Sequence, residues 1–85
     1  MLKTYENWNC DLHEYLEVGD TVDDELAVHM RDVLPPIMFG NVIQMGEPYE
    51  HINGKPTYLT IEEVDGEWIY RGRCFEGETT EPIRH

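Results

Sequence analysis

The chain has 85 residues, of which 18 are acidic and 6 are Lys or Arg, so its formal net charge is -12. This length allows one domain with a small core, and 40% hydrophobic with 11% aromatic residues excludes an acidic disordered chain. The charge argues against direct nucleic-acid binding and against binding to an anionic membrane, because both require clustered basic side chains.

The first predicted element is a helix over about residues 4–18. Thr4 is a suitable N-cap and Gly19 follows the last residue, and both are typical signals for the ends of a helix. Spacings of three and four residues place the apolar side chains of this segment on one helix face: Tyr5, Trp8, Leu12, Tyr15 and Leu16.

A second helix is predicted over about residues 21–34. Asp20 or Thr21 is the expected N-cap, and the acidic residues 23–25 favour a helix start, where the helix dipole attracts negative charge. Pro35-Pro36 ends this helix, because proline donates no backbone hydrogen bond. The apolar face comprises Val22, Leu26, Met30, Val33 and Leu34.

Two dipeptides predict an antiparallel sheet in the rest of the chain. Asn53-Gly54 and Asp65-Gly66 favour type I′ hairpin turns, in which both central residues have positive φ. Strands are therefore expected over about residues 41–52, 56–64 and 67–75. The predicted cross-strand pairs include Ile61–Tyr70, Leu59–Gly72 and Tyr58–Arg73. Side-chain alternation then assigns to the buried face Leu59, Ile61, Trp68, Tyr70 and Cys74.

These elements predict an α+β fold with one domain over residues 1–85. In this fold an N-terminal helical hairpin packs on a small antiparallel β-meander.

The chain contains one weak candidate for a metal or thiol site. Cys10 and His13 are one helical turn apart and would need Cys74 as a third ligand. A structural zinc site usually takes four ligands, so the alternative is that Cys10 packs and His13 is solvated. The sequence has no serine and no glycine-rich phosphate loop. We therefore assign no catalytic residue and expect no cofactor.

Two surfaces are candidates for partner binding. The apolar segment at the helix-to-sheet junction contains Ile37, Met38 and Phe39, and it either closes the core or contacts a partner. Tyr49, Tyr58 and Arg73 form a second candidate, with a cation–π contact between Tyr58 and Arg73. More often, such a pair only covers a wet sheet face.

Five segments are distinctive as a set: Asp11-Leu12-x-x-Tyr15-Leu16, Gly19-Asp20-x-Val22-Asp23, Leu34-Pro35-Pro36, Gly46-Glu47-Pro48-Tyr49, and residues 68–79. With them, the chain resembles a group of small uncharacterised bacterial proteins of gut bacteria and their mobile elements. The resemblance covers nearly the whole chain and implies a bacterial, cytoplasmic accessory role. It assigns no activity and no catalytic residue.

The sequence leaves three functional hypotheses open. The first is a small acidic protein-interaction module that binds a protein partner or associates with itself. The alternatives are an acidic nucleic-acid mimic that inhibits a nucleic-acid-binding protein, and a Cys/His metal-site protein. A cytoplasmic location is expected, because the chain has no apolar segment of membrane-spanning length and only two cysteines.

Overall fold

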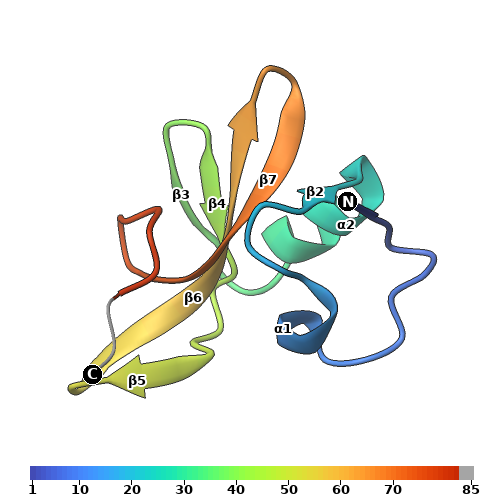
Figure 1. Ribbon diagram of the computed structural model, residues 1–85. Helices are drawn as coiled ribbons and strands as arrows, with labels where there is room; N and C mark the ends of the chain where they lie inside the picture. The colour runs from blue at the N-terminus through green and yellow to red at the C-terminus, as the bar shows by residue number, and fades with distance from the viewer. Residues whose placement is uncertain (83–85) are drawn as a thin grey trace.

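A seven-stranded, mostly antiparallel sheet forms the framework of the computed structural model, which describes residues 1–82 (Figure 1). The strand order is β1-β2-β7-β6-β4-β3, and β5 pairs with β6 outside this path. Only β1 and β2 run parallel to each other among the described pairs. The strands are β1 (Leu2–Lys3), β2 (Thr21–Val22), β3 (Ile37–Phe39), β4 (Val42–Gln44), β5 (Glu50–Ile52), β6 (Lys55–Val64) and β7 (Glu67–Phe75).

The fold is mixed α+β, but the predicted N-terminal helical hairpin is wrong. Only α1 (Leu12–Tyr15) is helical within the expected helix 4–18, and strand β2 separates it from α2 (Asp24–Arg31). Short polar residues account for the late start. The Asn7 amide donates to the Thr4 hydroxyl, and Asp11 caps α1 by accepting from the amide of His13. Such side-chain-to-backbone bonds favour turns over helix interiors.

Helix α2 is shorter than the predicted range 21–34 at both ends. Asp23, and not Asp20 or Thr21, is the N-cap, and its carboxylate accepts from the amide of Leu26. The two residues before this cap form β2 instead, because Thr21 and Val22 pair with Ile69 and Trp68 of β7. Asp32 is the C-cap, so the helix ends before Pro35-Pro36.

The core lies between the helices and one face of the sheet. Buried residues from the helices pack on Ile43, Leu59, Ile61 and Tyr70 of the central strands. Figure 1 shows α1 and α2 on this side of the sheet, and the red segment after β7 on the other side. The predicted apolar spacing selected four of its five core residues correctly even where the backbone is not helical: Trp8, Leu12, Tyr15 and Leu16 pack in or against this core. Tyr5, the fifth, is 41% exposed.

Both predicted hairpin turns are confirmed. Asn53, Gly54, Asp65 and Gly66 all have positive φ, and the turns connect β5 to β6 and β6 to β7. The predicted strand 41–52 is instead two strands, β4 and β5, which Gly46-Glu47-Pro48 separates. A third hairpin, β3–β4, turns at Gly40-Asn41, where Gly40 has the positive φ that a type II′ turn needs at this position.

A β-bulge between β6 and β7 changes the predicted register. The pair Ile61–Tyr70 is as expected, but Arg71 is an extra residue, so Thr60 lies opposite Gly72 and Leu59 opposite Arg73. The predicted pairs Leu59–Gly72 and Tyr58–Arg73 are therefore wrong. The shift moves Arg73 to the helix side of the sheet and Cys74 to the other side. Gly72 accommodates the bulge with a φ of 93°.

The segment after β7 is attached to the second face of the sheet by Gln44. This side chain is fully buried, and its Nε2 atom lies 3.1 Å from the Thr60 hydroxyl and 3.0 Å from the Phe75 carbonyl. Its Oε1 atom accepts from the amide of Gly77 at 3.3 Å. Because a buried amide must have all its polar atoms paired, Gln44 fixes the path of the chain beyond β7.

Candidate interaction surfaces

The strand β3 forms one end of the sheet and carries exposed apolar side chains. Met38 is 59% exposed, and Leu34, just before the strand, is 82% exposed. Residues 33–46 contain no charged residue, although the chain as a whole carries a net charge of -12. We call Leu34 together with Ile37–Phe39 the β3 edge. It is an uncharged, apolar strand edge on a strongly acidic molecule.

The backbone of β3 also presents hydrogen-bonding groups outward. In a hairpin with a two-residue turn, the residues that flank the turn bond to each other, and the next pair does not. Phe39 and Val42 flank the Gly40-Asn41 turn, so the Met38 amide and carbonyl point away from β4. Since β3 is the last strand of the sheet that residues 1–82 form, this strand edge is free of any described partner.

The predicted residues Ile37, Met38 and Phe39 are therefore partly surface residues. Ile37 and Phe39 are half-buried, and Met38 is the exposed member. Sequence analysis missed Leu34, because it placed this residue on the buried face of a helix. The absence of charge between Asp32 and Glu47 is the signal that marks the whole segment.

A second surface surrounds three aromatic rings on the helix side of the molecule. The ring centroids lie 5.8 Å apart for Tyr5 and Trp8, 5.6 Å for Tyr5 and His29, and 4.8 Å for Trp8 and His29. We call these three residues the aromatic cluster. The Trp8 indole N–H donates to the Cys10 carbonyl, which fixes the ring. Sequence analysis did not find the cluster, because His29 comes from α2 and the other two residues come from the loop before α1.

Surface hollows adjoin the aromatic cluster. One hollow of about 440 Å³ is lined by Trp8, His29, Met45 and Tyr49, and also by the acidic residues Asp11 and Glu47. Another hollow of about 420 Å³ is also lined by His29, together with Tyr5, Val28 and three acidic residues of α2 and its C-cap, Asp24, Glu25 and Asp32. Both walls are aromatic and acidic.

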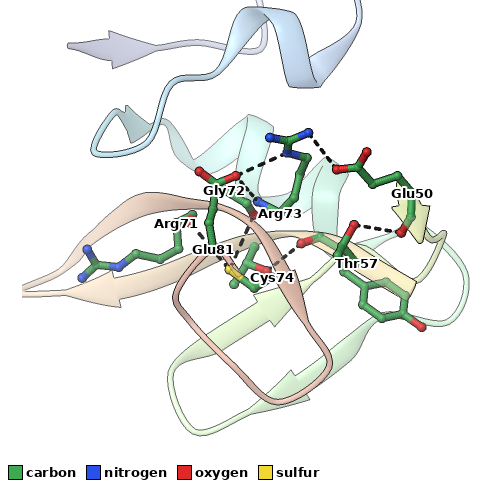
Figure 2. A network of polar contacts seen from close by, with 9 residues as sticks. Glu50, Thr57, Arg71, Gly72, Arg73, Cys74 and Glu81 are labelled. Atoms are coloured by element: carbon green, nitrogen blue, oxygen red, sulfur yellow. Dashed lines mark hydrogen bonds and ion pairs between the residues drawn. The ribbon is translucent and has the colours of Figure 1, made fainter. Parts of the chain in front are cut away.

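The predicted patch of Tyr49, Tyr58 and Arg73 is rearranged by the bulge. Arg73 lies over the Tyr49 ring, 5.9 Å from its centroid, whereas Tyr58 is buried on the other face of the sheet. Figure 2 shows Arg73 between two carboxylates: Nη1 lies 2.8 Å from Glu50 Oε1, and Nε lies 3.3 Å from Glu81 Oε2. Glu81 also accepts from the Arg73 amide, so it covers part of the β7 edge. This network stabilises the fold.

The acidic side chains of the chain include several with structural roles. Asp11 and Asp23 cap helices, and Asp20 accepts from the Glu17 amide while lying 3.7 Å from the Lys3 ammonium. Glu62 pairs with Arg71 at 2.9 Å. These carboxylates serve the chain's own backbone and basic groups, so the net charge overstates the negative surface that a nucleic-acid mimic would present.

The metal candidates Cys10, His13 and Cys74 are not assembled into a site. Cys10 is exposed in the loop before α1, and Cys74 is buried on the opposite face of the sheet from the helices. Within residues 1–82, no group of three or more His, Cys, Asp or Glu side chains is arranged to hold a metal ion. The His13 ring instead contacts the Tyr49 ring, with centroids 4.6 Å apart.

Two buried groups have raised pKa values. Burial raises the pKa of the Tyr70 phenol, and the Glu81 carboxylate adds to this effect while Arg73 opposes it. Burial also raises the pKa of the Cys74 thiol, and a hydrogen bond with Thr60 partly offsets the effect. A buried thiol of this kind stays protonated and is a poor nucleophile. Neither group has the environment of a catalytic residue.

Comparison with known proteins gives no family assignment: no protein-family model, curated protein or solved structure matches the chain. The resemblance to small bacterial proteins and the cytoplasmic location therefore stay predictions. None of the helices in residues 1–82 has the length and apolar character needed to span a membrane.

Proposed function

We propose that the chain is a small acidic protein-interaction module that associates with a second copy of itself through the β3 edge. One observation carries this proposal: a free strand edge with an exposed Met38 lies within the charge-free segment of a chain whose net charge is -12. Exposed, uncharged strand edges pair readily with other strands, and proteins usually protect them with charged residues or proline.

The charge distribution supports a second copy as the occupant. Two chains of charge -12 repel each other over most of their surfaces. Approach through residues 33–46 brings the least charge together, because this segment has none. Salt screens the remaining repulsion, so added salt should strengthen the association. Association with a basic partner would instead weaken as salt is added.

The strand geometry supports a symmetric arrangement. In an antiparallel β3–β3 pair related by a two-fold axis, Met38 of each copy would lie opposite Met38 of the other, with two backbone hydrogen bonds between them. Pro36 has no amide hydrogen, so the pairing is limited to a short stretch. A three-residue strand with few apolar side chains supports only a weak, concentration-dependent dimer.

Sedimentation velocity over a range of protein and salt concentrations tests this proposal. The wild-type chain is expected to shift from monomer to dimer as concentration rises, and at lower concentration when salt is added. Met38→Lys places two like charges at the proposed interface and should abolish the shift. Val18→Lys is the matched control, since Val18 is also an exposed apolar residue but lies outside the β3 edge.

Two results would contradict the proposal. The first is a wild-type chain that remains monomeric at every concentration. The second is a dimer that Met38→Lys and Val18→Lys weaken equally. Far-UV circular dichroism of both variants shows whether the fold is retained.

A further inference from the structure

We propose that the hollow beside the aromatic cluster binds an arginine side chain from a basic peptide segment of a partner protein. This site is separate from the β3 edge, because Met38 and Leu34 do not line it. The inference therefore does not depend on self-association.

Aromatic side chains form part of the lining of this hollow. Trp8, His29 and Tyr49 all line the hollow of about 440 Å³, and Met45 and Leu59 contribute apolar surface beside them. A guanidinium group stacks on aromatic faces, and tryptophan gives the strongest cation–π attraction. The indole N–H of Trp8 is already bonded to the Cys10 carbonyl, so the ring contributes its π-surface to a ligand and not its donor.

Acidic side chains form another part of the lining. Asp11 and Glu47 line the same hollow as Trp8, and neither Lys nor Arg is among the described residues that line it. The Arg73 guanidinium lies over the Tyr49 ring, 5.9 Å from its centroid, but it is paired there with the carboxylates of Glu50 and Glu81. A carboxylate beside an aromatic face suits a guanidinium group, which stacks with its plane and donates hydrogen bonds from its edge. Asp11 already accepts from the His13 amide as the N-cap of α1, so Glu47 is the residue available to pair with the ligand.

The neighbouring hollow explains why the ligand is a peptide segment and not a single amino acid. His29 lines both hollows, and the second one is lined by Asp24, Glu25 and Asp32. A chain that inserts one arginine beside Trp8 would continue past His29 and meet these carboxylates. Basic residues next to the inserted arginine therefore add electrostatic attraction.

The test uses a short acetylated peptide of alternating glycine and arginine, and the same peptide with citrulline in place of arginine. Citrulline keeps the shape of the side chain but carries no charge. Binding to the full chain is followed by NMR, with the Trp8 indole N–H as the reporter. The arginine peptide is expected to shift this resonance in a saturable manner, and the citrulline peptide is not.

Two charge-reversal variants separate the site from general attraction to an acidic protein. Glu47→Lys is expected to weaken binding by about fivefold or more, because it removes one favourable charge contact and puts a like charge beside the guanidinium group. Glu67→Lys makes the same change in net charge at an exposed position of the β6–β7 hairpin, and it should weaken binding by less than about twofold at moderate salt. Glu47→Gln should have an intermediate effect, which guards against a folding defect in the lysine variant.

Any of three results would overturn the inference: no saturable shift of the Trp8 indole, equal binding of the arginine and citrulline peptides, or equal weakening by Glu47→Lys and Glu67→Lys. None of these results depends on whether the protein dimerises. Sedimentation of the same samples reports on the β3 edge separately.

Discussion

Tyr70 is a core residue with a buried hydroxyl group. It is 2% exposed, and its hydroxyl has no hydrogen-bond partner within residues 1–82. Burial and the nearby Glu81 carboxylate both favour the protonated phenol, so its pKa is raised. Such a hydroxyl lowers stability at neutral pH, because no hydrogen bond offsets its desolvation.

We expect Tyr70→Phe to leave the free energy of unfolding at pH 7 unchanged or to raise it by about 1 kcal/mol, since it removes a buried hydroxyl that has no described partner. Above about pH 10, the unfolded chain releases the phenol proton whereas the folded chain keeps it, so the wild-type protein loses stability as pH rises. The slope for this one proton is at most about 1.4 kcal/mol per pH unit. Tyr70→Phe removes it and should make the alkaline decline shallower.

Urea denaturation at several pH values between neutral and strongly alkaline measures both effects. Tyr5→Phe is the control, since it removes the same hydroxyl from an exposed side chain. The buried phenol would not be responsible for the alkaline loss of stability in two cases. In the first, the free energy of unfolding of Tyr70→Phe declines with pH as steeply as that of the wild type. In the second, Tyr5→Phe shows the same decline as Tyr70→Phe. Cys74, whose pKa is also raised by burial, contributes a decline of the same sign in all three proteins.

At the level of elements, the connection from α2 to β3 is held by close backbone packing on Gly46. A Cβ atom at Gly46 would lie 2.0 Å from the Pro35 carbonyl oxygen and 2.7 Å from that of Leu34. Both neighbours are backbone atoms of a proline-containing segment, so they cannot move aside as a flexible side chain would. This contact fixes the chain path just before strand β3.

Gly46→Ala should therefore destabilise the fold by about 2–3 kcal/mol, as overpacking of a tight site does. Gly40→Ala is the matched control: Gly40 has a positive φ of 53°, but a Cβ atom there would meet no atom within 4 Å beyond the adjacent residues. It should cost less, about 1–2 kcal/mol, because an alanine rarely adopts this positive φ. Thermal denaturation of both variants makes the comparison, and an equal loss in the two would exclude the proposed backbone contact.

The sequence predicted those elements that short-range signals specify. Asn53-Gly54 and Asp65-Gly66 placed two hairpins correctly, since positive φ at both positions restricts the turn type. The prediction of a helical hairpin was wrong, because the apolar spacing of residues 5–16 indicates which side chains contact the core but not which backbone conformation carries them. Strand β2 depends on pairing with β7, which is far away in sequence. The bulge at Arg71 could not be predicted either, and it decides where Arg73 lies.

Of the candidate surfaces, too, one could be recognised in part from the sequence and the other only from the tertiary fold. The β3 edge is continuous in sequence, and its lack of charge was visible there, whereas the exposure of Leu34 and Met38 depends on the order of strands in the sheet. The aromatic cluster brings together two loop residues and one helix residue that follows them by more than twenty positions. No local pattern could indicate it, because only the tertiary fold places His29 beside Tyr5 and Trp8.

For the molecule as a whole, the net charge and the fold act in opposite directions on association. A chain of charge -12 repels its own copies, and the fold leaves one uncharged strand at an edge of the sheet where that repulsion is smallest. The central claim is that this edge pairs with the same edge of a second copy. The Met38 amide is the atom group that reports on it, since it points away from β4.

Hydrogen exchange of the Met38 amide, measured by NMR across a wide range of protein concentrations, tests this claim most directly. If two copies pair through β3, exchange of this amide slows as protein concentration rises, while the amide of Gly66 in the exposed β6–β7 turn is unaffected. A Met38 amide that exchanges at the same rate at every concentration would contradict the account.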